Sequence, residues 1–318
     1  EFMQAFWDIE EAQAKAIQLL AGFVRDKSGK ALFSVPYLLM FTESITSAMK
    51  THVDSVNLQV EGCSLLLEIF SQALEQDVVV ALDENVTSSL LDTVRKHSEN
   101  EELLSLVCTL LMMISASEVA AENLRKVGVI PDLLSILRNF LHNEQICLSC
   151  CGVLWSLAVS ENNVDQALLK SAVPVTSVVL QEHLQNGAVT ESACSALWAL
   201  SLQGCLIKND YEPTTALLLD ALRMNPGRPV LVKNACLALV SLLRLSEIPA
   251  LRFITDSKGS GVNLIKYAYH LHFDDPEVVE DICMLIKEMA QYDDVVLDML
   301  SQKMEELLSE IKSCFPSS

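Results

Sequence analysis

Apolar residues recur along this chain at a spacing that predicts helices stacked as repeats. Six cysteines stand 42 to 47 residues apart, each inside a similar apolar segment. Counted from the residue before each cysteine, apolar or small residues fall at steps 0, 3, 4, 7 and 8. That spacing puts them in one stripe of a helix, and a period near 43 residues is typical of a helical solenoid. The six cysteines are Cys63, Cys108, Cys151, Cys194, Cys236 and Cys283.

A second, shorter amphipathic segment precedes each of these helices, after a linking stretch. In one linker Gly128 can end a short helix in the left-handed region, and Pro131 can start the next helix. The sequence therefore predicts three helices per repeat, of which the third is the longest. Because no repeat buries its apolar face alone, stability must come from stacking on its neighbours. The shorter segments are 45–52, 90–97, 132–142, 176–183, 216–225 and 264–273.

Both ends of the array are predicted to be capping helices. We expect an N-terminal helix over Gln4 to Arg25, a turn at Lys27 to Lys30, and a final amphipathic helix from Met304 to Cys314 whose apolar face closes the array or dimerises. Glu1-Phe2 before Met3 resembles residues left by a cloning site, so we expect a fragment of a longer protein. We expect N-terminal capping helices at 1–44, repeats at about 45–86, 87–129, 130–173, 174–213, 214–262 and 263–302, and a C-terminal capping helix at 303–318.

Composition supports a helical fold and narrows the partners. Apolar residues make up 51% of the chain, against 10 Gly and 9 Pro among 318 residues, which are too few for many β-turns. The longest apolar run, Leu103 to Ile114, is too short to span a bilayer. With 22 basic and 42 acidic residues the formal charge is −20, which disfavours nucleic acid and anionic lipid as ligands. We expect the cysteines to be small buried apolar residues. This use of cysteine indicates a reducing compartment, the cytoplasm or the nucleus.

The segment NLRKVGVIPDLLSIL (123–137), followed by CCGVLWSLA (150–158), resembles the armadillo repeat. This resemblance implies an all-α, right-handed α-solenoid of about six repeats, whose third helices line a concave groove that binds extended peptides or other proteins. HEAT repeats are the near alternative, and the turn at Gly128 and Pro131 favours armadillo. The stretch 47–70 also resembles armadillo-type tails of kinase-like proteins, although the chain itself contains no GxGxxG, HRD or DFG kinase motif.

The armadillo proteins of nuclear import carry a Trp ladder and an Asn ladder along the third helix, and this chain carries neither. The absence of both ladders indicates that the chain is not an import adaptor, because the Asn ladder holds the peptide backbone and the Trp array holds lysine stems. The groove also lacks the basic row of catenin-like members, and Lys233 is isolated there. The Trp positions hold Ser64, Thr109, Gly152, Ser195, Leu237 and Met284, and the Asn positions hold Glu68, Met113, Ser156, Ala199, Ser241 and Glu288.

Two tryptophans mark the candidate binding groove. Trp155 and Trp198 lie at the same position of consecutive repeats and could anchor a peptide, although packing between repeats is the alternative. Small residues around them leave room for a ligand side chain, and Glu191 with Glu280 indicates a partner of basic or mixed charge. The candidate groove residues are Gly152, Trp155, Ser156, Glu191, Ser195, Trp198, Ala199, Lys233 and Ser241.

The residues that could bind a metal or take part in catalysis are better explained by structural roles. Cys147, Cys150 and Cys151 suggest a metal site, but a closed zinc site needs four converging ligands, and Cys151 is simply the repeat cysteine. Lys258 to Gly261 is interpreted as a flexible loop. Four histidines each lie eleven residues before a repeat cysteine, which indicates that they cap helix C-termini. They are His52, His97, His183 and His272.

The sequence therefore predicts a non-enzymatic scaffold that binds a protein or extended peptide in the concave groove. We expect no cofactor, no catalytic residue and no metal, and a monomer or weak dimer. The alternative is a regulatory tail of a kinase or pseudokinase chain that acts intramolecularly or recruits partners. An exchange factor or chaperone cofactor built on such repeats is a third class.

Overall fold

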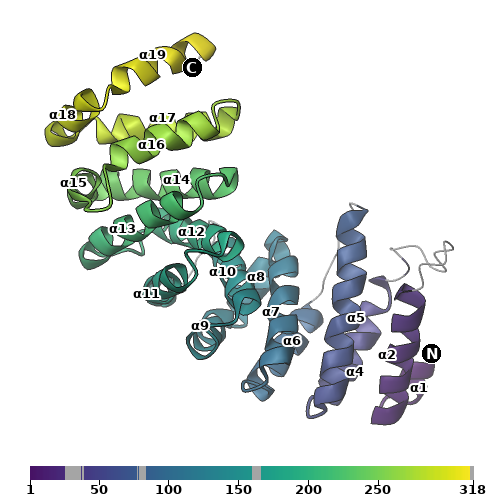
Figure 1. Ribbon diagram of the computed structural model, residues 1–318. Helices are drawn as coiled ribbons and strands as arrows, with labels where there is room; N and C mark the ends of the chain where they lie inside the picture. Colours follow the sequence, from purple (N-terminus) through teal and green to yellow (C-terminus); the bar gives the residue numbers. More distant parts are fainter. Residues whose placement is uncertain (26–36, 38, 77, 79–83, 160–165, 316–318) are drawn as a thin grey trace. The chain divides into compact units, whose positions relative to one another are not determined.

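The computed structural model describes residues 1–25, 37, 39–76, 78, 84–159 and 166–315, and these residues form eighteen α-helices without a strand. The chain divides into two compact units, Glu1–Asn162 and Asn163–Ser318. Each unit is a stack of helices (Figure 1). The predicted all-α fold of stacked repeats is confirmed.

The first unit consists of two layers of helices. The longer helices α2, α5, α7 and α10 follow one another in one layer, and α4, α6, α8 and α9 pack against them. The bounds are α1 Phe2–Ala5, α2 Glu10–Arg25, α4 Thr42–Thr51, α5 Val56–Glu75, α6 Glu84–Lys96, α7 Glu101–Ser115, α8 Glu118–Lys126, α9 Val129–Asn139 and α10 Glu144–Val159.

The second unit repeats this arrangement. Helices α12, α14 and α17 form the layer of long helices, and α11, α13 and α16 pack against them in turn, with α15 beside α13 and α16. The bounds are α11 Gln166–Glu182, α12 Gly187–Leu202, α13 Lys208–Met224, α14 Pro229–Leu245, α15 Ile248–Thr255, α16 Gly261–Leu271, α17 Pro276–Met289, α18 Asp293–Ser301 and α19 Met304–Cys314. The final helix has the predicted bounds.

Short polar side chains start the long helices where the sequence has its polar breaks. The Asn100 side chain accepts a hydrogen bond from the Leu103 amide at 3.0 Å, and Asn186 does the same for the amides of Ala188 and Val189. These caps satisfy amides that have no partner within the helix. The stripe that follows each cap then enters the core, and the repeat cysteines from Cys63 to Cys236 are buried.

Among the residues that the structure describes, the predicted three helices per repeat occur in two places. Helices α8, α9 and α10 follow this plan, and Gly128 between α8 and α9 has the expected left-handed backbone, with φ of 72°. Helices α15, α16 and α17 follow it as well. The prediction is wrong at α11 and α13, where a single helix continues through Pro174 or Pro213. Apolar residues are buried on both sides of Pro174, so packing along the whole helix offsets the hydrogen bond that proline removes.

The N-terminus departs from the single predicted helix. Helix α1 ends at Ala5 and α2 begins at Glu10. The Gln13 side-chain amide donates to the carbonyls of Met3 at 2.9 Å and Phe6 at 2.6 Å, which satisfies groups that a continuous helix would have bonded internally. The predicted turn at 27–30 lies outside the described residues. Over the described part of the chain, every helix is too short or too polar to cross a bilayer.

Candidate functional site

In each compact unit the layer of long helices presents one outward side, on which residues at helical spacing are half-buried or exposed. We call these positions the long-helix face of that unit. Most of the predicted groove residues lie there. In the second unit the face comprises Glu191, Ser195, Trp198, Lys233, Asn234, Leu237, Ser241, Asp281 and Met284, and in the first unit Thr109, Met113, Gly152, Trp155 and Ser156.

Polar side chains bridge α12 and α14 on the second unit's face. Arg228 Nε lies 3.1 Å from a carboxylate oxygen of Glu191. The Asn234 amide donates to Ser195 Oγ at 2.6 Å, and Ser195 Oγ donates in turn to the Glu191 carbonyl at 2.8 Å. The negative charge predicted at Glu191 is therefore balanced by Arg228, and the Ser195 hydroxyl is already bonded on both sides.

The same kind of bridge joins α14 to α17. Lys233 pairs with Glu277, and this bond raises the pKa of the Lys233 ammonium. The sequence singled out Lys233 as a lone basic residue of the groove and did not reveal this acidic partner, because Glu277 lies on the next repeat. Arg244 lies 2.8 Å from Glu288, a buried carboxylate that also accepts a hydrogen bond from Gln291 at 2.6 Å.

Asp281 lies half-buried on α17 with other acids near it. Burial raises the pKa of the Asp281 carboxyl to about 6, and the charges of Glu280, Glu277 and Asp275 act in the same direction. The Lys233 ammonium opposes this shift but does not cancel it. The α17 end of the face therefore carries excess negative charge that falls when Asp281 takes up a proton.

The apolar candidates of the second unit separate into surface and core. Trp198 is half-buried, so part of its ring reaches the surface. Ala199 is fully buried, and its prediction as a groove residue is wrong because one residue along a helix turns the side chain by about 100° into the core. Ser241 is half-buried, and its hydroxyl donates to the Leu237 carbonyl at 3.1 Å within α14.

Trp155 is the most exposed predicted groove residue. Its side chain is 38% exposed on α10, between the half-buried Gly152 and Ser156. Ser115 Oγ lies 3.3 Å from Ser156 Oγ and links α7 to α10 beside it. A large aromatic ring with small neighbours on a packed helix layer has the features of a binding hot spot. Trp155 lies in the first unit and Trp198 in the second, so their sharing of one ligand stays a prediction.

The cysteines of the CxxCC cluster, Cys147, Cys150 and Cys151, are fully buried in the first unit. Among the described residues, no three His, Cys, Asp or Glu side chains are grouped to hold a metal ion. Cys147 Sγ instead lies 3.2 Å from the Leu141 carbonyl near the end of α9, and burial raises its pKa to about 12. Gln59 and Thr190 bond the carbonyls at the ends of α4 and α11 in the same way. Cys147 therefore belongs to a recurring set of side chains that donate hydrogen bonds to the carbonyl groups at the end of a helix.

The recurring histidines have a role that the sequence only half revealed. They lie at the ends of the shorter helices, as predicted, and His97 and His272 bond the turn of the preceding repeat. His97 Nε2 donates to the Val53 carbonyl at 2.6 Å, and His272 Nε2 to the Pro226 carbonyl at 2.7 Å. Asn225, eleven residues before Cys236, bonds the Leu184 carbonyl at 2.7 Å. Their separation of 41 to 46 residues from these partners was the available signal, because it equals one repeat.

No family model matches this chain. Among solved structures it is similar to a chain from one described as "A conserved phosphorylation switch controls the interaction between cadherin and beta-catenin in vitro and in vivo". The two sequences are 14% identical, the TM-score is 0.40, and the match covers 92% of this chain and 68% of that chain. The stacked all-α fold is established by this chain's own helices and their packing.

Proposed function

We propose that this chain is a non-enzymatic scaffold that binds a protein or an extended peptide on its long-helix faces. The observation that carries the proposal is the exposed ring of Trp155 on α10. Burial of such a ring stabilises a complex, because tryptophan removes a large apolar area from water and loses little side-chain entropy. The small residues Gly152 and Ser156 leave space beside it for a partner's side chain.

The electrostatics of the second unit's face favour a partner of basic or mixed charge. Three ion pairs already join neighbouring helices there. A purely acidic or purely basic ligand would therefore have to break these pairs or form further ion pairs with the same residues. Glu280 and Asp281 add negative charge beyond these pairs. A ligand with some Lys or Arg side chains complements that surplus.

The burial of Cys63, Cys194 and Cys236 argues against covalent catalysis at these three cysteines. A nucleophilic cysteine needs an accessible thiolate. Burial instead raises the pKa of Cys194 to about 12 and holds the pKa values of Cys63 and Cys236 well above their usual range. These side chains serve as core residues, and the proposed scaffold needs no cofactor.

Trp155→Gln tests the proposal without changing the charge of the chain. Proteins captured from a cell lysate by the purified chain would be cross-linked and identified by mass spectrometry. At least one captured protein should cross-link near α10 and be reduced about tenfold with the variant, the loss expected for one hot-spot residue. Because the Trp155 side chain is exposed, the variant should keep nearly the stability of wild type, and a thermal melt checks this.

Val119→Gln is the matched control, because Val119 is an exposed apolar residue of α8 in the same unit. It should leave the captured set unchanged. If Trp155→Gln also leaves every captured protein at its original level, the face around Trp155 is not the binding site. Capture of a kinase-like segment from the same polypeptide by this face would support the regulatory-tail function instead.

A further inference from the structure

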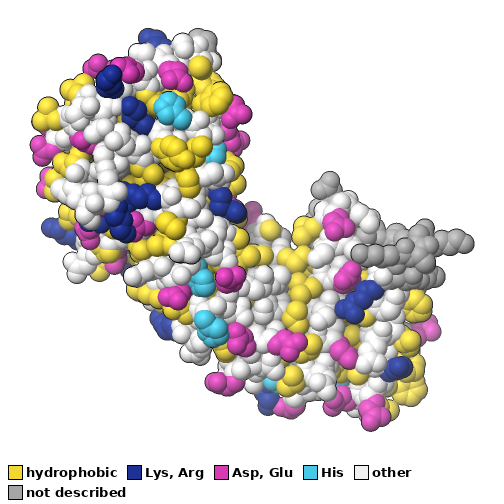
Figure 2. Space-filling view, in the orientation of Figure 1, with side chains coloured by type: hydrophobic (Ala, Val, Ile, Leu, Met, Phe, Trp, Pro, Cys, Tyr) yellow, Lys and Arg dark blue, Asp and Glu magenta, His cyan; other side chains and the backbone are white. Residues whose placement is uncertain are grey.

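The N-terminal end of the first unit presents apolar side chains to water. Phe6, Trp7, Ile9 and Leu19 are 42%, 61%, 47% and 56% exposed. We call these four residues, with Met3, the N-terminal face. A cluster of exposed apolar side chains of this kind indicates an interaction site. In Figure 2 hydrophobic and acidic side chains adjoin at the end where Figure 1 places α1 and α2.

Hydrogen bonds from side chains to the backbone hold this face in place. The Gln13 amide holds the carbonyls of Met3 and Phe6, and Gln13 itself is buried. His52 Nε2 lies 3.0 Å from the Trp7 carbonyl, so the backbone of Trp7 is held while its ring points to solvent. A surface held in this way loses little conformational entropy when a partner binds.

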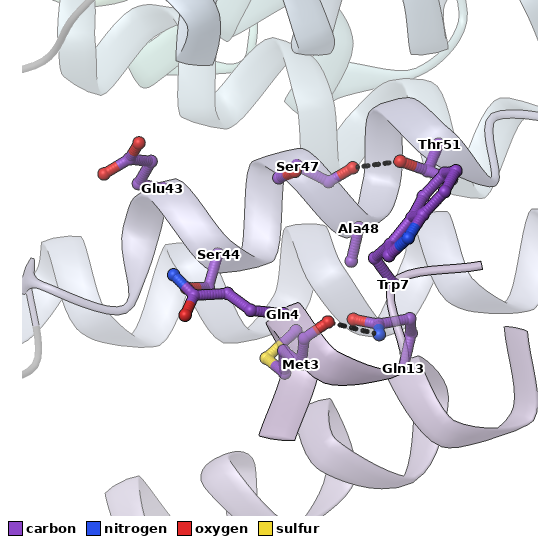
Figure 3. A pocket seen from close by; sticks show the side chains of 9 residues that line it. All are labelled: Met3, Gln4, Trp7, Gln13, Glu43, Ser44, Ser47, Ala48 and Thr51. Atoms are coloured by element: carbon purple, nitrogen blue, oxygen red, sulfur yellow. Dashed lines mark hydrogen bonds between the residues drawn. The ribbon is translucent and has the colours of Figure 1, made fainter. Parts of the chain in front are cut away.

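Two adjoining hollows shape the surface. One, of about 250 Å³, lies between the α1 segment and α4 and is lined by Met3, Trp7, Glu43 and Thr51 among others (Figure 3). The second, of about 330 Å³, is mostly apolar, and its lining includes Met3, Ala16 and Leu19. Met3 and Ser44 line both. Hollows of this size accept single apolar side chains of a partner.

Helix α2 carries a second apolar stripe that faces away from the core. Gln13 and Ile17 are the buried residues of this helix. Ala12, Ala16 and Leu19, spaced at i, i+4 and i+7, lie half-buried or exposed on another side. That spacing is the pattern by which two helices pack along each other. A partner helix is therefore the element that fits this stripe best.

The charges around the face select the kind of helix. Asp8, Glu10, Glu11 and Glu43 are all exposed, and Lys15 is the nearby base on α2. We propose that the N-terminal face docks an amphipathic helix of a partner protein whose apolar stripe is flanked by Lys or Arg. A second copy of this chain fits less well, because it would bring the same acidic residues together. This surface is separate from the long-helix faces and does not depend on their proposed function.

The test uses the full chain and a displayed library of 18-residue helical peptides. Each peptide carries Leu at i, i+3, i+4 and i+7, and its other positions vary among Lys, Glu, Gln and Ala. Peptides selected on the wild-type chain near physiological salt should be rich in Lys. A synthetic peptide of the selected sequence should bind Trp7→Gln/Leu19→Gln about tenfold more weakly, as expected for loss of central apolar anchors.

Two further variants make the result decisive. Leu297→Gln/Leu300→Gln removes two comparably exposed apolar residues of α18 and should leave the peptide's affinity unchanged. Glu43→Lys keeps the apolar surface and should weaken a Lys-rich peptide several-fold by charge alone. Thermal melts confirm that each variant is folded.

The proposal is overturned by any of four results. The library yields no enriched peptide, the enriched peptides are rich in Glu, or they bind Trp7→Gln/Leu19→Gln as tightly as wild type. The fourth is a dimer in sedimentation equilibrium that the same double variant dissociates, because the face would then serve a second copy of the chain.

Discussion

Single side chains hold successive repeats together. His97, His272 and Asn225 occupy the same position of their repeats, and each bonds a carbonyl in the turn of the repeat before it. A buried carbonyl without a partner costs more than a typical hydrogen bond contributes. These positions therefore stabilise the contact between repeats as well as the end of their own helix.

His272→Ala should lower the free energy of unfolding by about 1–2 kcal/mol, because it leaves the Pro226 carbonyl without its donor. His272→Asn should recover part of the loss, since Asn225 performs the same role one repeat earlier. Urea unfolding followed by circular dichroism measures both. His270→Ala, at an exposed position of the same helix, is the control and should stay within about 0.5 kcal/mol of wild type. Equal losses for His270→Ala and His272→Ala would contradict this role.

Asp281 links stability to pH in the opposite direction from a carboxylate held by an ion pair. Its pKa is about 6 in the folded chain against 3.8 for the free group. Ionising Asp281 lowers the free energy of unfolding, because the carboxylate is less stable in the folded chain than in the unfolded chain. This loss is absent below pH 3.8, where both states are protonated, and is complete once the pH has risen through 6. Asp281→Asn should thus stabilise the chain at pH 7.5, by about 1 kcal/mol once solvent screening of this half-buried group is considered.

The measurement is urea unfolding of wild type and Asp281→Asn near pH 4 and near pH 7.5. The difference should be present at the higher pH and nearly vanish at the lower one. Asp274→Asn removes an exposed carboxylate just before α17 and serves as the control. If Asp281→Asn instead destabilises the chain at pH 7.5, the attraction of Lys233 outweighs burial and the neighbouring acids.

Helices were the part of this fold most open to prediction from sequence. The stripe around each repeat cysteine predicts a long helix, and the final helix was placed at its observed bounds, Met304–Cys314. The number of helices per repeat was predicted less well. Proline signals a boundary locally, but burial on both sides of Pro174 decides that α11 continues. Such a choice depends on neighbouring repeats, which a local pattern does not contain.

The turn between α8 and α9 depends on a conformation that glycine adopts readily. Gly128 has φ of 72°, and a Cβ there would meet no heavy atom within 4 Å, so the cost of substitution is backbone strain alone. Gly128→Ala should therefore destabilise the chain by about 1–2 kcal/mol. Gly227→Ala is the matched control, because Gly227 also has open space but lacks a positive φ. It should be neutral or slightly stabilising.

Chemical denaturation of both glycine variants measures this difference. A loss at Gly227→Ala as large as that at Gly128→Ala would indicate that side-chain volume, and not the left-handed backbone, limits these turns.

At the scale of the whole molecule, the repeat pattern places most of the candidate residues on one helix face but does not show their ion-pair partners. Trp155, Gly152 and Ser156 lie on the long-helix face because repeat position fixes helix face. The partners of Glu191 and Lys233 were missed, because each lies on an adjacent repeat about forty residues away. The exposed apolar N-terminal face was also missed. A helix with apolar residues on two sides does not reveal from its sequence which side is buried.

The charge of the chain makes a prediction about salt. A formal charge of −20 opposes the compact state through self-repulsion. Ion pairs between repeats, such as Arg244 with Glu288, act the other way, but each exposed or half-exposed pair is worth little. Raising NaCl from roughly 0.02 to 0.3 M shortens the screening length from about 20 to about 6 Å and should therefore raise the melting temperature by a few degrees. KCl should act equally if screening is the cause. A fall in melting temperature would mean that the inter-repeat ion pairs outweigh the repulsion of the acidic surface.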